Sequence, residues 1–123
     1  MKTFNPSSTH PARAVQAWQI LTGLAMNQQT LTYKRLSELM YRKHAAGVLS
    51  DILGHIAYYC NDHKIPPLTV IVVGQDRGTP GSDIPINPAD IDKKRQQVFT
   101  FDWYDVYPPS EAELRTAFEN NKP

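Results

Sequence analysis

Apolar side chains recur at spacings of three and four residues through about the first half of the chain, which predicts a series of amphipathic helices. The first is expected over residues 11–26, with Pro11 in the first turn, where proline is tolerated. Polar residues 27–29 end it. Residues 1–10 are mostly polar and turn-rich, so we expect a flexible arm there. The buried stripe is predicted to comprise Val15, Trp18, Leu21 and Ala25.

Two further helices are predicted on either side of a short basic turn. Thr32 is a suitable N-cap for a helix over residues 33–41, and a third helix is expected from Ala45 to about residue 62. The segment between them reads Arg42-Lys43-His44. The side chains predicted to face the core are Leu36, Leu39, Met40, Leu49, Ile52, Leu53 and Ile56.

The pattern changes after Pro66 and Pro67, which exclude further helix. Residues 68–73 are apolar and β-branched, which predicts a buried strand. Residues 74–81 are rich in turn formers, and they make either the wing of a hairpin or a long loop, with residues 82–87 as a possible return arm.

Two more helices are predicted near the C-terminus. Asn87 and Pro88 are typical of a helix start, because asparagine caps and proline suits the first position. Ser110 and Glu113 have the spacing of a capping box for the last helix. The sequence therefore predicts an α+β, mostly helical fold. We expect a winged helix-turn-helix core with a small β-hairpin and two additional C-terminal helices, in a single domain over residues 11–123.

Composition agrees with one globular domain. The chain has 123 residues, 41% of them hydrophobic and 20% charged, which suffices for a single core. We expect no membrane association, because no apolar run reaches the length of a membrane span. A single cysteine, Cys60, excludes an internal disulfide framework and, without an apolar secretory segment, favours the cytoplasm.

Charge is distributed unevenly, although the formal net charge is only +1. Residues 1–50 carry six basic side chains against Glu38 as the sole acidic one, whereas residues 51–123 carry seven basic and eleven acidic side chains. A basic first half suits a polyanionic partner, and an acidic second half does not. Chance scatter of surface charge is the alternative explanation.

Signatures of catalysis and of metal binding are weak. The segment 74–81 is glycine-rich, but no helix start follows it as a phosphate-binding loop requires. His55, Cys60, Asp62 and His63 are close in sequence, yet no pair has the spacing of a zinc finger. Cys60 lies near a predicted helix C-terminus, where the dipole disfavours a thiolate, so we interpret it as a packing residue. We expect no enzyme activity, no metal and no cofactor.

The helix pair around the basic turn is the remaining candidate for function. A helix-turn-helix places its second helix in the major groove of double-stranded DNA, and residues around the turn contact phosphates. A solvated helical hairpin with ordinary surface charges is the alternative. The residues that we expect to bind DNA are Thr32, Tyr33, Lys34, Arg35, Arg42, Lys43, Ser50 and, on the wing, Arg77.

Residues 15–73, about half the chain, resemble the DNA-binding domain of the O6-alkylguanine-DNA alkyltransferases and the alkyltransferase-like proteins. The resemblance implies a winged-helix scaffold. It also implies that Tyr33 matches the tyrosine that helps to rotate the phosphate of a flipped nucleotide. The matching pieces are residues 17–21, residues 31–39, residues 45–49 with Leu53-Gly54, and the Pro-Leu-plus-valine segment through Val72-Val73.

Departures from that family's pattern affect its chemistry. The reactive Pro-Cys-His-Arg motif would fall at about residues 68–71, which contain no cysteine, histidine or arginine. Nor does tryptophan stand there, as it does in the alkyltransferase-like branch. Gly47 occupies the place of the arginine that fills the gap left by a flipped base, and glycine cannot intercalate. We therefore expect neither alkyl transfer nor specific flipping of damaged bases.

Two functions from different classes remain open. The first is a non-catalytic DNA-binding protein that contacts phosphates through its basic helix-turn-helix edge. The second is a protein-interaction module, an adaptor or an inhibitor, on a repurposed alkyltransferase-like scaffold. Five aromatic residues in positions 99–107 either close the core or include exposed interface anchors, for which Trp103 and Tyr104 are the candidates. The sequence predicts no oligomeric state.

Overall fold

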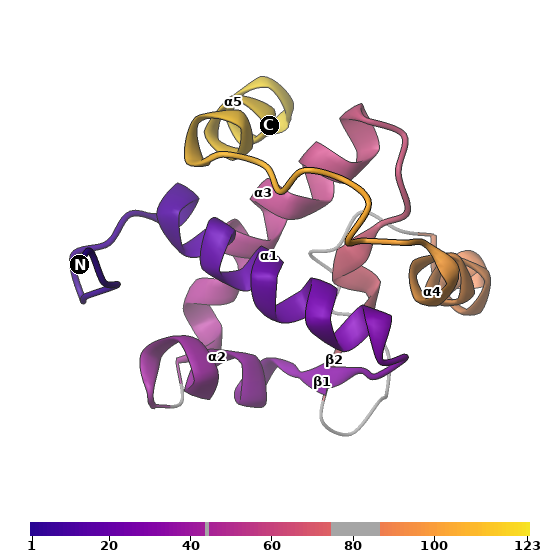
Figure 1. Ribbon diagram of the computed structural model, residues 1–123, viewed down its shortest axis with the longest axis horizontal. Helices are drawn as coiled ribbons and strands as arrows, with labels where there is room; N and C mark the ends of the chain where they lie inside the picture. Colours follow the sequence, from indigo (N-terminus) through magenta and orange to yellow (C-terminus); the bar gives the residue numbers. More distant parts are fainter. Residues whose placement is uncertain (44, 75–86) are drawn as a thin grey trace.

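The computed structural model describes residues 1–43, 45–74 and 87–123, and in these residues the chain forms α-helices around one hydrophobic core. The longest helix, α1, crosses the middle of the molecule, with α2 on one side of it and α5 on the other (Figure 1). The predicted α+β, mostly helical class is confirmed. The α-helices are α1 (His10–Met26), α2 (Tyr33–Tyr41), α3 (Leu49–Asp62), α4 (Ile91–Thr100) and α5 (Glu111–Asn121).

Helix α1 begins and ends close to the predicted positions. Thr9 is its N-cap, and the Oγ1 of Thr9 accepts a hydrogen bond from the Ala12 backbone N–H at 3.3 Å. Three members of the predicted stripe, Trp18, Leu21 and Ala25, are buried, whereas Val15 is only partly so. Arg13 lies on the same buried side, which the sequence analysis did not predict.

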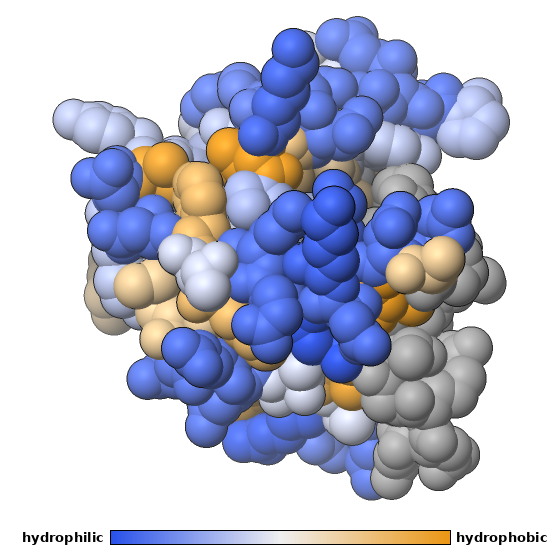
Figure 2. Space-filling view, turned by 90° about the vertical axis from the view of Figure 1, so that its right-hand side faces the viewer, coloured by the Kyte–Doolittle hydropathy of each residue, from blue (hydrophilic) through white to orange (hydrophobic). Residues whose placement is uncertain are grey.

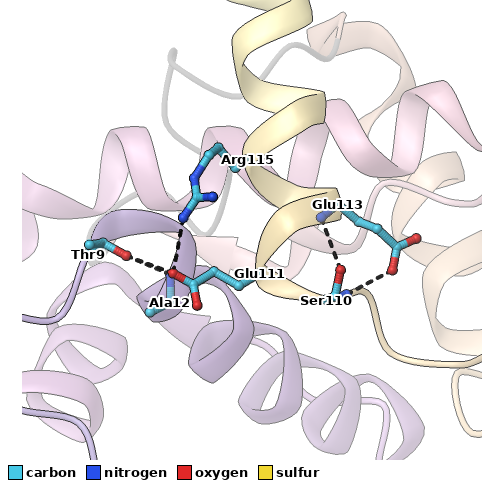
Figure 3. Close-up of polar contacts among 6 residues, drawn as sticks. All are labelled: Thr9, Ala12, Ser110, Glu111, Glu113 and Arg115. Carbon is cyan, nitrogen blue, oxygen red and sulfur yellow. Dashed lines mark hydrogen bonds and ion pairs between the residues drawn. The ribbon is translucent and has the colours of Figure 1, made fainter.

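The N-termini of α1 and α5 meet through side chains (Figure 3). Glu111 Oε1 accepts a hydrogen bond from the Thr9 hydroxyl at 3.1 Å. The same oxygen forms an ion pair with the Arg115 guanidinium at 3.3 Å. The predicted capping box is confirmed, because Ser110 and Glu113 exchange hydrogen bonds of 3.0 and 3.1 Å. These bonds to Ser110 lower the pKa of the Glu113 carboxyl.

Helices α2 and α3 bury most of the predicted apolar positions. Thr32 caps α2 as expected, since its Oγ1 accepts from the Arg35 backbone N–H at 3.0 Å. Leu39 was predicted to face the core and does not, because the buried face of this nine-residue helix consists of Leu36, Ser37 and Met40. The buried side chains of this helix pair include Leu36, Met40, Leu49, Ile52, Leu53 and Ile56.

The predicted strand over residues 68–73 is mostly wrong. Residues Leu68–Ile71 form a 3-10 helix, η2, and only Val72–Val73 form a strand, β2. Strand β2 pairs in parallel with β1 (Leu31–Thr32), in the register Leu31 with Val72. Because β1 offers only two residues, the other buried backbone groups must find partners locally, as in the bond from the Val70 N–H to the Pro67 carbonyl at 3.0 Å.

The predicted hairpin has no counterpart in the described residues, whose one sheet is this parallel pair. The turn was predicted at residues 74–81 and the return arm at residues 82–87, and all of these but Gly74 and Asn87 lie outside the residues that the structure describes. The third helix also differs from the prediction. A 3-10 turn, η1 (Ala46–Val48), precedes α3, which begins at Leu49.

The two additional C-terminal helices are confirmed. Asn87 caps a 3-10 turn, η3 (Pro88–Asp90), with its Oδ1 accepting from the Ala89 backbone N–H at 3.0 Å, and α4 follows directly. Helix α4 buries Val98 and turns exposed polar residues such as Lys93 and Gln96 outward. The face of the molecule on the α4 side is accordingly hydrophilic across its centre (Figure 2).

Candidate nucleic-acid interface

The first part of the predicted site lies at the N-terminus of α2. Lys34 and Arg35 are exposed in the first turn, where the helix also presents backbone N–H groups that suit an anion. Arg35 forms a long ion pair with Glu38, at 3.9 Å between side chains that are both substantially exposed, so the pair neutralises Arg35 weakly. Tyr33 is half-buried and packs against the core.

The second part lies at the opposite end of the same helix. Arg42 ends α2 in the left-handed conformation, with φ of 61°, and its backbone N–H donates to the Glu38 carbonyl at 2.8 Å. The side chains of Arg42 and Lys43 are exposed, and within the described part of the chain neither pairs with a carboxylate. Lys34 and Arg42 are about 12 Å apart along the helix axis, because each residue adds about 1.5 Å.

A buried hydroxyl fixes the connection between α2 and α3. Ser37 donates a hydrogen bond to the Lys34 carbonyl at 2.8 Å and accepts one from the Ala45 backbone N–H at 3.2 Å. Its side chain is fully buried. The start of the connection to α3 is therefore held against α2, which limits how far Arg42 and Lys43 can move from that helix.

One face of the first turn of α3 is open to solvent, opposite the buried Leu49 and Ile52. Ser50 is exposed, and a side chain added at Gly47 would meet no described atom within 4 Å. A partner could therefore contact this surface. It carries no arginine or lysine that could donate hydrogen bonds to the edges of DNA bases. Thus α2 carries Thr32, Lys34, Arg35, Arg42 and Lys43 at its two ends, and α3 adds Ser50. Arg77 and the expected wing lie outside the described residues.

The aromatic segment after α4 separates into buried and exposed members. Trp103 was a candidate interface anchor, and this is wrong: it is only 2% exposed, and its indole N–H donates to the Val98 carbonyl at 2.8 Å. It also packs edge-on against Trp18, with ring centroids 5.7 Å apart. Trp103 therefore fills a place in the core beside Trp18 of α1 and Val98 of α4. Tyr104, in contrast, is 68% exposed.

Cys60 lies in the core, as its interpretation as a packing residue requires. It is fully buried, and this burial raises the pKa of its thiol to about 12. Residues 68–71, which carry no cysteine, histidine or arginine, are fully buried as well. Among the described residues, no three histidine, cysteine or acidic side chains come together as metal ligands, and no helix is long and apolar enough to cross a membrane.

Arg13, like Ser37, is a buried polar residue that sequence analysis missed. Its guanidinium donates to the Met40 carbonyl and the Asn5 carbonyl, both at 2.9 Å, and lies 4.3 Å from the centroid of the Tyr41 ring. Arg13 thereby joins the N-terminal arm, α1 and the last turn of α2, where a cation also suits the helix dipole. The available signal was its spacing, since Arg13 precedes the buried Ala17 and Leu21 at intervals of four.

Comparison of the chain with models of protein families, with curated proteins and with solved structures gave no match. Function must therefore be argued from the residues and their arrangement.

Proposed function

We propose that this protein binds double-stranded DNA without catalysis, through phosphate contacts along α2, and that its scaffold is a winged helix-turn-helix. One observation carries the proposal: four exposed cationic side chains stand at the two ends of α2, and only one of them has an acidic partner among the described residues. These side chains are Lys34, Arg35, Arg42 and Lys43.

The arrangement of elements supports a helix-turn-helix. Helix α2 leads through a short connection into α3, and β1 and β2 flank this pair in sequence. The hydrogen bonds of Ser37 hold the connection against α2. They thereby limit how far the basic turn can move relative to the exposed face at the start of α3. In this proposal α3 approaches a groove with Ser50, while the four cations contact the phosphates on either side.

The resemblance to the alkyltransferase DNA-binding domain adds support for the scaffold and for Tyr33 beside a phosphate. Alkyl transfer is not part of the proposal, because Leu68–Ile71 carry no reactive side chain and are buried. Gly47 offers nothing to insert between bases, and the first turn of α3 lacks the side chains that read base edges best. We therefore propose binding with little sequence preference.

The proposal is tested by the anisotropy of a fluorescent random-sequence duplex titrated with protein over a salt series. If all four cations neutralise phosphates, the logarithm of the affinity should fall with the logarithm of salt concentration at a slope of about −3.6. Reversal of Lys34 and Arg35 to Glu should abolish binding. The same charge change at Lys64 and Lys93, which are exposed and distant from α2 in sequence, serves as the control.

A wild-type protein that does not bind the duplex at low salt would refute DNA binding. Equal loss in the two double variants would show that only net charge matters, and would reject the α2 edge as the binding face.

A protein-interaction module is the second candidate, and the segment after α4 favours it. Tyr104 and Tyr107 are 68% and 94% exposed, next to the exposed Asp102 and Asp105. Exposed tyrosines are typical of interface anchors. This candidate predicts that the Lys34 and Arg35 reversals leave function intact, whereas loss of the exposed tyrosines does not.

A further inference from the structure

The exposed large apolar and aromatic side chains of the described residues fall into two groups, apart from Met1 at the terminus. Phe4, Leu39 and Val48, each 40–42% exposed, line one groove. Tyr104 and Tyr107 belong to the loop between α4 and α5. Isolated exposed apolar side chains need no explanation, but their concentration at two places indicates contact surfaces.

The groove is basic. It has a volume of about 710 Å³ and lies between the N-terminal arm, α1, the end of α2 and η1. Arg13, Arg42 and Lys43 line it, and none of the described residues that line it is acidic. Arg13 is 4% exposed, and no described carboxylate pairs with it, although a buried charge is normally paired. We name this surface the basic groove.

The loop over residues 102–107 has the complementary chemistry. Asp102 and Asp105 are exposed beside the two tyrosines. The loop is also ordered by its own contacts: Asp102 accepts from the Tyr104 N–H at 3.1 Å, and the Asp105 N–H donates to the Asp102 carbonyl at 3.1 Å. The buried Trp103 anchors it to α4. A preorganised loop loses little conformational entropy on binding. We name it the acidic loop.

The acidic loop cannot fill the basic groove of its own chain. The Tyr104 hydroxyl lies 3.8 Å from the Cβ position of Gly23, near the C-terminal end of α1, whereas Arg13 lies in the first turns of that helix. The two positions are about 15 Å apart along α1. In Figure 1 the loop passes on the α5 side of α1, and α2 lies on the other side.

From this complementarity we infer that the acidic loop of one copy docks in the basic groove of a second copy. Its carboxylates pair with Arg42 and Lys43, and its tyrosines cover Phe4, Leu39 and Val48. The contact is head-to-tail, so a pair of copies keeps one unused groove on one copy and one unused loop on the other, and association continues into a ring or an open chain of copies. The inference does not depend on DNA binding.

The test uses sedimentation velocity of the full chain over a range of concentrations, without nucleic acid. A groove variant carries Leu39→Glu and Val48→Glu, and a loop variant carries Asp105→Arg and Tyr107→Ala; all four side chains are exposed, so folding should be preserved, which circular dichroism checks. Gln96→Glu with Thr116→Glu is the matched control for the groove variant, and Glu119→Arg for the loop variant.

We expect the wild type and both controls to self-associate as concentration rises. Each docking variant alone should associate at least about tenfold more weakly. An equimolar mixture of the two docking variants should form a one-to-one dimer and nothing larger, because only the intact groove of one and the intact loop of the other remain. A wild type that stays monomeric, a variant that associates like the wild type, or a mixture without the dimer would each overturn the inference.

Discussion

His55 lies flat against Phe118, with ring centroids 4.2 Å apart and 7° between the ring planes. The stack joins α3 to α5. Phe118 is held from a second direction by Tyr58, at 6.0 Å between centroids. The last helix therefore packs onto the core through this ring as well as through the buried Leu114 and Ala117, and two predictions arise from the contacts of the ring.

Gly54 faces the same ring. A Cβ at this position would come within 3.2 Å of the Phe118 ring, whereas a Cβ at Gly23 in α1 would meet its nearest neighbour at 3.8 Å. Alanine favours a helix over glycine by about 1 kcal/mol, so Gly23→Ala should stabilise the protein by up to that amount. Gly54→Ala should destabilise it by about 1 kcal/mol, because Phe118 would have to shift away from its contacts with His55 and Tyr58. Urea unfolding of both variants measures the difference, and a stabilising Gly54→Ala would show that the α3–α5 contact is looser than described.

The stability of the protein should depend on pH through His55. Burial lowers the pKa of its imidazole, and the hydrogen bond from the ring to the Asp51 carbonyl opposes this only in part. The folded state thus prefers the neutral ring. Stability from this source is complete above the ordinary pKa of about 6.5 and declines as the pH falls through it. The free energy of unfolding should therefore fall less between pH 8 and pH 5.5 in His55→Phe, which keeps an aromatic ring, than in the wild type. An equal fall in both proteins would assign the pH dependence to other groups.

Arg13 should contribute strongly to stability. Arg13→Ala removes the donors to the Met40 and Asn5 carbonyls and the packing on Tyr41, and should lower the free energy of unfolding by roughly 3 kcal/mol. Arg13→Lys should recover little of this stability, because a single ammonium group cannot donate to both carbonyls as the planar guanidinium does. Arg115→Ala, which breaks an exposed ion pair with Glu111, should cost less than about 1 kcal/mol. Similar losses for the two alanine variants would contradict this assignment.

The thiol of Cys60 should be inert in the folded protein. With its pKa near 12 and its side chain fully buried, the thiolate is scarce and inaccessible. Alkylation by iodoacetamide at pH 8 should be at least about a thousandfold slower than in the urea-unfolded chain, where the ordinary pKa of about 8.5 applies. Rapid modification of the folded protein would mean that the core opens around the end of α3.

Local chemistry was sufficient to predict most of the helices and three of the caps, but not the Thr9 cap of α1 or the start of α3 at Leu49. Each of the three predicted caps bonds to a backbone group within three residues of itself, so the neighbouring sequence is enough to predict it. These caps are Thr32, Asn87 and the pair Ser110 and Glu113. The buried faces of α1 and α3 followed from spacing, because a long helix can bury only one regular stripe. The exposure of Lys34, Arg35, Arg42 and Lys43 was likewise expected from their chemistry.

Tertiary contacts decided the rest. The β-branched run at residues 68–73 favoured a strand, but the two-residue β1 left it almost nothing to pair with, so it became mainly a 3-10 turn. Leu39 has the character of a core residue and is exposed because no described element covers it, whereas Arg13 is buried where carbonyls of the arm and of α2 converge on it. The basic groove and the acidic loop arise in the same way, since each is assembled by contacts between segments far apart in the chain. Sequence determines local propensity, but which surfaces are covered depends on what the folded chain brings against them.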